Sequence, residues 1–345
     1  MLAAGIIAHH QKLSALLAVG ILLLPATQYP ATTWWSKPDL DREYVLSLDV
    51  EHYFGNIQKM RKHLETDRQI LWVTYYRNLY NATHPSEINS PVSLSRNLLA
   101  WNQPGTNGLI LPVNPSASFL SILFANELWF TLGDMTMAEH CAMLSMIFSP
   151  RNSGSRMIKR LAEINLVNGD DEAALKYLRI LDKTLLHKSW AEKRIPGQQT
   201  PRVKEWLEKK RRDIPTQDQL RSGNDAVTSL QNLVASNAGN LRAYEYLLCY
   251  HLLSKDLRSF VEDYVPGKVS SPIFAEALLI HLARQGNIRA EELIKYQIPV
   301  EIAKEFADYT RLYEAKDTSL KEKYGKTYWF YYHFATTEPG KESKP

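Results

Sequence analysis

The stretch RMIKRLAEINLVNGDDEAALKYLRILDKTLL, residues 156–186, decides the fold class. Apolar residues recur every three or four positions before the Asn168-Gly169-Asp170 turn, and the same spacing resumes after it. That spacing places them on one face of an α-helix on each side of the turn. The glycine can take the left-handed conformation that ends a helix, and the aspartate can cap the next one. The stretch therefore predicts two helices packed as a hairpin.

Small side chains accompany this turn. Ala162 precedes it, and Ala173 and Ala174 follow it, so the two helices can approach each other closely. We expect Gly169, Asp170, Ala173 and Ala174 to be structural residues of the hairpin.

The same turn chemistry recurs along the chain. Glycine or lysine followed by asparagine or aspartate ends a helix-length apolar pattern at Gly55-Asn56, Gly133-Asp134, Gly169-Asp170, Lys255-Asp256 and Gly286-Asn287. Two of the spacings, 36 and 31 residues, bracket the roughly 34 residues of a tetratricopeptide hairpin. One hairpin cannot bury both of its faces, so such units stack. The pattern predicts an all-α, irregular tetratricopeptide-like solenoid, with Gly133 and Gly286 as further structural residues. No unit carries the full consensus, and spacings of 78 and 86 residues break the period.

One long uncharged segment lies near the N-terminus. Residues Leu13–Ser36 carry no charge over 24 positions, a length of roughly 36 Å as a helix against a hydrocarbon core of roughly 30 Å. Trp34 and Trp35 close the segment, where amphipathic rings lie at a membrane interface. A secretory signal peptide and a buried core helix are the other interpretations. An uncleaved transmembrane helix is favoured over a signal because no small-x-small cleavage site follows and the preceding stretch is apolar.

These patterns divide the chain into four parts. Residues 1–38 are expected to be a membrane span or anchor, 39–192 a helical-repeat block, 193–224 a polar linker, and 225–345 a second helical-repeat block with an aromatic terminal helix. The linker holds the basic run Lys204–Arg212, in which Glu205 and Glu208 are spaced to pair with Lys209 and Arg212. A solvated helix is favoured there over a recognition patch.

The aromatic run Tyr328–Tyr332, followed by Phe334, is the densest feature of the sequence. One interpretation is a platform that stacks on carbohydrate or lies at a membrane surface. The other is a final helix whose rings close the end of the solenoid, as terminal repeats require. Because consecutive rings point all round a helix, some of them are buried in either case. We favour the closing helix, with Trp329 and Phe330 as its structural residues.

Composition and motifs argue against several classes of function. The 345 residues are 45% hydrophobic and 23% charged, with a net charge of only +4, and that basic charge is dispersed, unlike that of a nucleic-acid binder. Cys141 and Cys249 are too few for a disulfide framework or a zinc cluster. The ten histidines form no metal-binding spacing, and neither phosphate-binding glycine loops nor a nucleophile elbow occurs. We therefore expect no catalytic residues, no metal and no cofactor.

Four stretches together resemble a domain-of-unknown-function family of bacterial transmembrane proteins with a C-terminal tetratricopeptide-like helical region. They are Ser93–Leu111, Ser155–Ala191, Leu230–Asp256 and Tyr324–Phe334. The resemblance covers most of residues 40–334. It implies a membrane location and a helical architecture, but no activity. This chain departs from the family at its front, because only one convincing span is present.

Taken together, the sequence predicts a membrane-anchored helical-repeat protein that is not an enzyme and serves as an interaction or assembly module at the bacterial envelope. Its expected partners are the lipid bilayer, through the N-terminal span, and another envelope protein, but no nucleic acid. The basic residues that flank the span lean only slightly toward an inner-membrane protein with a periplasmic body. The alternative function is an accessory extramembrane region of a multispan lipid-linked sugar transferase.

Overall fold

The computed structural model describes residues 40–65, 71–83, 119–148, 154–216 and 226–335. All regular secondary structure in these ranges is helical, and no strand occurs in them. The chain divides into two units, Met1–Thr66 and Asp67–Pro345. The predicted all-α class is therefore confirmed for the part of the chain that the structure describes.

The first unit holds one helical hairpin. Helix α2 (Leu40–Tyr53) and helix α3 (Ile57–Leu64) are joined at Gly55, whose φ of +69° is a left-handed value. Leu48 and Met60 are completely buried, one from each helix. The turn predicted at Gly55-Asn56 thus joins two helices that pack against each other.

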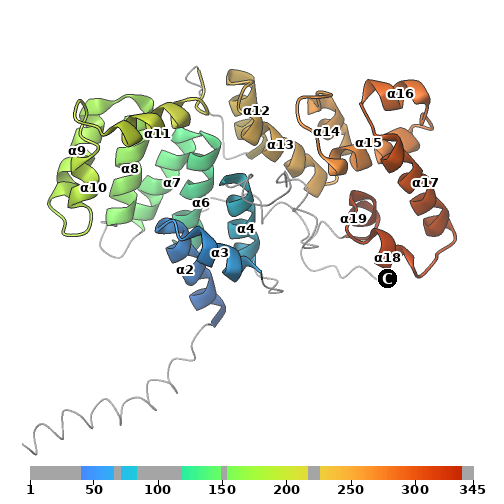
Figure 1. Cartoon of the computed structure of the whole chain (residues 1–345), viewed down its shortest axis with the longest axis horizontal. Helices are drawn as coiled ribbons and strands as arrows, with labels where there is room; N and C mark the ends of the chain where they lie inside the picture. Colours follow the sequence, from blue (N-terminus) through green and yellow to red (C-terminus); the bar gives the residue numbers. More distant parts are fainter. Residues whose placement is uncertain (1–39, 66–70, 84–118, 149–153, 217–225, 336–345) are drawn as a thin grey trace, which may run out of the picture. The chain divides into compact units, whose positions relative to one another are not determined.

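The other helices that the structure describes belong to the second unit (Figure 1). They are α4 (Leu71–Thr83), α6 (Phe119–Leu132), α7 (Met135–Ile147), α8 (Ser155–Asn168), α9 (Asp171–Asp182), α10 (Lys188–Glu192), α11 (Pro201–Arg211), α12 (Ala226–Ser236), α13 (Leu241–Leu253), α14 (Leu257–Asp263), α15 (Pro272–Arg284), α16 (Ala290–Lys295), α17 (Val300–Glu314), α18 (Leu320–Tyr324) and α19 (Tyr328–Phe334). Most of them pack against the next helix in the chain: α6 on α7, α7 on α8, α8 on α9, and α12 through α15 likewise.

The turns between these helices have the predicted chemistry. The φ angles of Gly133, Gly169 and Gly286 are +91°, +84° and +64°, and Lys255 adopts +57° although it has a Cβ. Asp134, Asp170 and Asp256 follow three of these residues, and each accepts a hydrogen bond from the backbone N–H three residues on. The fourth turn differs, because α16 begins only at Ala290 and Asn287 does not cap it. Local sequence therefore sets where most hairpins turn.

Small and apolar side chains form the core of the α7–α9 region. Ala162 of α8 and Ala174 of α9 are completely buried, whereas Ala173 is only partly buried. Ala142, Met157 and Leu161 form a core cluster that joins α7 to α8. Of the predicted pair Ala173 and Ala174, Ala174 therefore contributes more to the close packing of the helices than Ala173 does.

The predicted polar linker, residues 193–224, contains one helix in its first part, where the basic run is expected to be helical. It contains α11, which begins at Pro201 and buries Val203 and Leu207, one helical turn apart. Neither of the predicted ion pairs, Glu205 with Lys209 or Glu208 with Arg212, forms in this described helix. Two buried side chains on one face suffice to hold a mostly polar helix against α8. Residues 217–224 lie outside the described ranges.

The predicted membrane span, with Trp34 and Trp35, also lies outside them. Among the residues that the structure does describe, no helix is both long enough and apolar enough to cross a bilayer.

Candidate functional site at helices α6, α8 and α11

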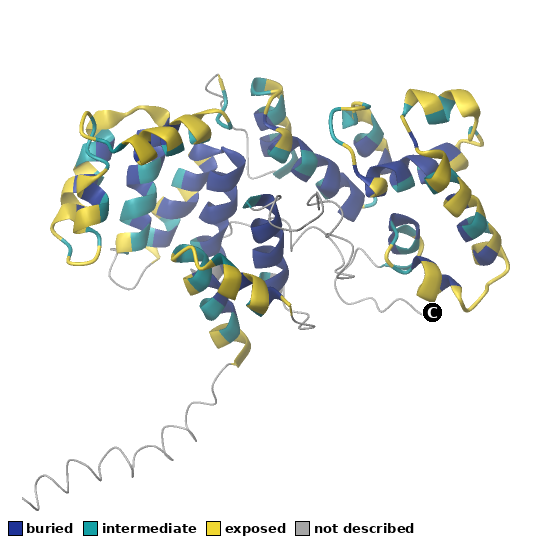
Figure 2. Cartoon of the chain, viewed as in Figure 1, coloured by how far each residue is buried: buried dark blue, intermediate teal, exposed yellow. Residues whose placement is uncertain are grey.

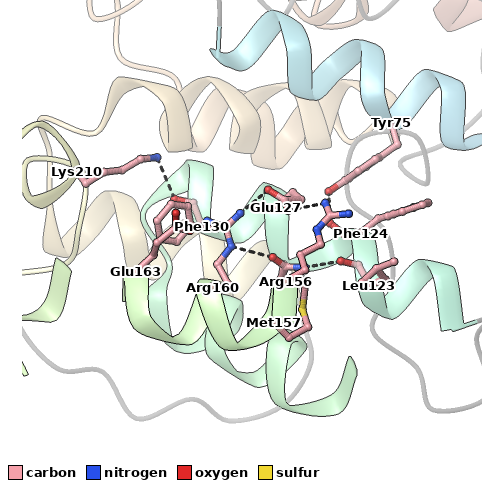
Figure 3. Close-up of polar contacts among 11 residues, drawn as sticks. Tyr75, Leu123, Phe124, Glu127, Phe130, Arg156, Met157, Arg160, Glu163 and Lys210 are labelled. Atoms are coloured by element: carbon pink, nitrogen blue, oxygen red, sulfur yellow. Dashed lines mark hydrogen bonds and ion pairs between the residues drawn. The ribbon is translucent and has the colours of Figure 1, made fainter. Parts of the chain in front are cut away.

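A carboxylate is buried in the middle of the most apolar helix of this region. Glu127 lies on α6, whose sequence FLSILFANELWFTL is otherwise almost uncharged, and only 6% of the residue is exposed. Arg156 and Arg160 of α8 each place an Nη2 atom on it, at 2.8 and 2.5 Å (Figure 3). A buried carboxylate remains charged only when cations and hydrogen bonds compensate its lost hydration. The two arginines supply that compensation.

Each of the three guanidinium nitrogens of Arg160 makes a hydrogen bond. Besides Glu127, its Nε donates to Oδ1 of Asn126 at 3.0 Å, and its Nη1 donates to Glu163 at 2.9 Å. The guanidinium carbon lies 3.9 Å from the centre of the Phe130 ring, a cation–π contact. Residues 156, 160 and 163 share one face of α8 because they are three and four positions apart. Helix periodicity places these residues together, and the contacts of Arg160 with its neighbours hold its side chain in one orientation.

Helix α11 brings a further cation to the same ring. Lys210 Nζ lies 4.6 Å from the centre of Phe130 and 3.5 Å from the Phe130 carbonyl oxygen, and Trp206 stacks near the ring with 6.2 Å between centroids. Burial, together with the positive charges of Arg242 and Arg160, lowers the pKa of Lys210 to about 8. Among the described residues no carboxylate lies within ion-pair distance of this ammonium.

Hydrogen bonds from Arg211 hold the C-terminal end of α11 against the C-terminal end of α8. Arg211 donates from Nε to the Val167 carbonyl at 3.0 Å and from Nη2 to the Leu166 carbonyl at 2.8 Å, which satisfies acceptors in the last turn of α8. Arg242 of α13 lies 3.4 Å from Asp213 Oδ2. The position of Lys210 is therefore determined by α8 and α13 as well as by its own helix.

A second aromatic ring next to α8 also faces cations. The Arg194 guanidinium lies 4.1 Å from the centre of the Trp190 ring, and Lys159 Nζ lies 5.2 Å from it. Burial lowers the pKa of both side chains. The Nε of Arg194 is buried and has no hydrogen-bond partner in the described ranges.

The sequence-predicted structural residues do not form this site. Gly133, Gly169 and Gly286 lie at separate turns, Asp170 caps α9, and Trp34 and Trp35 lie outside the described residues. Sequence reasoning missed Glu127, Arg156 and Arg160, and it placed Lys210 in a basic run for which a solvated helix is favoured over a recognition patch. A signal for three of them was present, namely a single acid in a helix-length apolar run and two arginines four positions apart.

The C-terminal aromatic residues belong to a different part of the second unit. Tyr328 and Trp329 are completely buried, Tyr331 is 3% exposed, and Phe330 is half-buried. Trp329 Nε1 donates to the Glu276 carbonyl of α15 at 2.9 Å, and the Tyr328 and Tyr331 hydroxyls donate to the carbonyls of Leu252 and Leu253. These three rings are part of the core, as a closing helix requires.

The two cysteines are buried and separate. Burial raises the pKa of the Cys141 thiol to about 12, and burial also raises the pKa of Cys249. Neither side chain is a thiolate at neutral pH, so both behave as small apolar residues. Across the described ranges, no three His, Cys, Asp or Glu side chains are placed to hold a metal ion.

A comparison with protein families matches residues 4–335 to one family model, described as a family of unknown function, DUF6057. No curated protein and no solved structure matches the chain.

Proposed function

The chain belongs to the family of unknown function DUF6057, and on that premise we propose that it is a non-catalytic interaction or assembly module. In this proposal its helices form tetratricopeptide-like repeats, and residues 13–36 anchor it to a bacterial envelope membrane with the body on the periplasmic side. Its partners are the bilayer and another envelope protein. The proposal draws its membrane part from the uncharged sequence of that segment.

Serial packing of neighbouring helices is the observation that carries the proposal. Helices α6, α7, α8 and α9 each pack against the next helix in the chain, and α12 to α15 do the same. Repeat proteins built in this way depend on contacts between neighbours and present extended surfaces to partners. An arrangement of this kind supports a binding role more directly than a catalytic one.

Exposed apolar side chains gather at one end of α7–α10. Ile147 and Phe148, where α7 ends, are 63% and 46% exposed, and Leu185 and Leu186, between α9 and α10, are 97% and 85% exposed. Figure 2 shows the turn between α9 and α10 as largely exposed. His187 Nε2 lies 3.2 Å from Ser155 Oγ, so the α9–α10 turn lies beside the start of α8. Apolar side chains concentrated on a surface mark interaction sites more often than scattered ones do.

Site-specific photo-crosslinking in cells tests the proposal. A photoreactive phenylalanine analogue replaces Leu185 or Leu186 in the full chain, and a control replaces Ile294, which is 77% exposed on α16. We expect both leucine positions to give an adduct with the same envelope protein, and Ile294 to give none with it. Identical sets of adducts at all three positions, or no adducts at any of them, contradict the interaction module.

A further inference from the structure

Positive charge exceeds negative charge around Phe130 and Trp190. We define the cation row as Arg194, Lys159, Arg160, Lys210 and Arg242. The described carboxylates among them are Glu127, Glu163 and Asp213. Lys159 lies close enough to Arg160 and Arg194, and Lys210 close enough to Arg160 and Arg242, for their charges to repel each other. The row therefore includes cations from the segment after α10, from α8, from α11 and from α13.

The three carboxylates already have cationic partners. Glu127 is shared by Arg156 and Arg160, Glu163 pairs with Arg160, and Asp213 pairs with Arg242. Lys210, by contrast, has only the carbonyl and the ring of Phe130 as neighbouring acceptors within the described ranges. Arg194 likewise keeps a buried Nε–H without an acceptor there. Two members of the row, Lys210 and Arg194, thus have no carboxylate within ion-pair distance in the described ranges.

Fold stability does not account for Lys210. Holding an ammonium in a half-buried position beside two guanidinium groups costs free energy in the folded state. A neutral side chain of similar length would cover Phe130 without that cost. The charge at this position therefore calls for a reason other than folding stability.

We propose that the cation row binds an extended acidic peptide segment of a protein partner, with one carboxylate meeting Lys210 and another meeting Arg194. The inference rests on the proposed interaction function and names the chemistry of the partner. A linear ligand fits because the cations follow one another across α8 and do not converge on one point, as a single phosphate ion would require. The two residues that would meet the peptide, Lys210 and Arg194, are both half-buried and so retain partly exposed side chains.

Peptide binding to the full chain in detergent tests the assignment. The probe is fluorescein-labelled hexaglutamate, hexaglutamine carries the same label without charge, and fluorescence anisotropy reports binding. We expect hexaglutamate to bind and hexaglutamine not to bind. The variant Lys210→Gln should weaken hexaglutamate binding about fivefold or more, the loss of one charge-assisted contact. Its matched control is Lys209→Gln, which removes the same charge from an exposed position of the same helix and should change binding less than about twofold.

Several results would overturn the inference. Equal weakening by the two variants would mean non-specific attraction. Displacement of the probe by inorganic phosphate at matched ionic strength would mean a small-anion site, and tighter binding of an oligothymidylate of equal charge would mean a nucleic-acid site. A melting curve of Lys210→Gln that matches or exceeds that of the natural chain shows that lost binding is not lost folding. If hexaglutamate fails to bind while the adducts at Leu185 persist, the acidic partner is wrong and the interaction module stands.

Discussion

The side-chain nitrogen of Asn240 donates a hydrogen bond of 2.7 Å to the carbonyl of Leu132, which lies 108 residues earlier in the chain. The same nitrogen donates to the Asp213 carbonyl at 2.8 Å, and the side-chain oxygen caps α13 by accepting from Ala243 N. One buried amide thus connects the end of α6, the segment after α11 and the start of α13. The two series of stacked helices are joined through it.

Replacing Asn240 should therefore cost more than replacing an ordinary helix cap. We expect Asn240→Ala to lower the free energy of unfolding by about 2–4 kcal/mol, because a cap is lost and two buried carbonyls lose their donor. The matched variant is Asp170→Ala, which removes an exposed cap and should cost about 1 kcal/mol. Urea unfolding of both variants measures the difference. Equal losses would show that the long-range bonds contribute nothing.

Gly133 and Gly169 should differ in their tolerance of alanine. Both have positive φ, which costs an alanine about 1–2 kcal/mol. At Gly133 an added Cβ would also lie 2.2 Å from the Asp213 carbonyl oxygen, whereas at Gly169 it would meet nothing within 4 Å. We expect Gly133→Ala to be destabilising by about 2–5 kcal/mol, since the backbone of Asp213 must move. Thermal melting ranks the two variants, and a smaller shift for Gly133→Ala would contradict the close approach.

Trp329 should contribute much more to stability than the next residue. It is completely buried and its indole N–H is bonded to α15, so Trp329→Ala should cost about 3–5 kcal/mol. Phe330 is only half-buried and packs on Phe334, with 4.5 Å between ring centres, so Phe330→Ala should cost less. Differential scanning fluorimetry compares them. If both variants melt like the natural chain, α19 does not close the second series of helices.

Lys210 should make the free energy of unfolding depend on pH between about pH 8 and pH 10.5. Its pKa is about 8 when folded and 10.5 when unperturbed, so between these values the unfolded chain binds more protons. The penalty for burying the charge is thus fully present below pH 8 and is relieved as the pH rises toward 10.5. Partial exposure of Lys210 to solvent reduces this penalty. We therefore expect Lys210→Met to stabilise the protein by about 1–3 kcal/mol at pH 7.

Urea unfolding of the natural chain and of Lys210→Met at pH 7 and pH 10 checks this sign. The groups that face Lys210 from α8 and from residues 213–242 are Arg160, Glu163, Asp213 and Arg242, and they are unchanged in both proteins. The stability difference should therefore shrink as the pH rises. A constant difference would mean that the substitution acts through packing alone.

The uncharged N-terminal segment leads to a prediction about whether the full chain stays with membranes. If residues 13–36 span a bilayer, the full chain should stay in the membrane pellet after carbonate extraction, and a version beginning at Asp39 should stay in the supernatant. Release of the full chain by carbonate or high salt would remove the anchor from the proposed function.

Local chemistry explains why the turns could be predicted from sequence. The left-handed residues at 133, 169, 255 and 286 and the caps at Asp134, Asp170 and Asp256 act within a few positions of themselves. The sequence around each turn therefore contains the whole signal. The hairpins follow from it.

The α6–α8–α11 site depends on contacts that no short window contains. Glu127 meets Arg160 across 33 positions, and Lys210 meets Phe130 across 80. The sequence indicates the helix at α11 but not its packing, because its two buried residues, Val203 and Leu207, lie among charged neighbours. Which polar side chains converge is decided by how the hairpins stack, and spacing along one helix does not determine that.

The hydrogen bonds between α19 and earlier helices can form only late in the synthesis of the chain. A ribosome delivers α6, α7, α8 and α9 in sequence, and each can pack on its predecessor as soon as it emerges. The carbonyls of Leu252 and Leu253 must instead wait for the hydroxyls of Tyr328 and Tyr331, more than 70 residues later. During that interval the apolar side of α15 that Trp329 will cover is bare. A pause in translation between residues 284 and 328 would therefore prolong the stage at which the nascent chain most needs a chaperone.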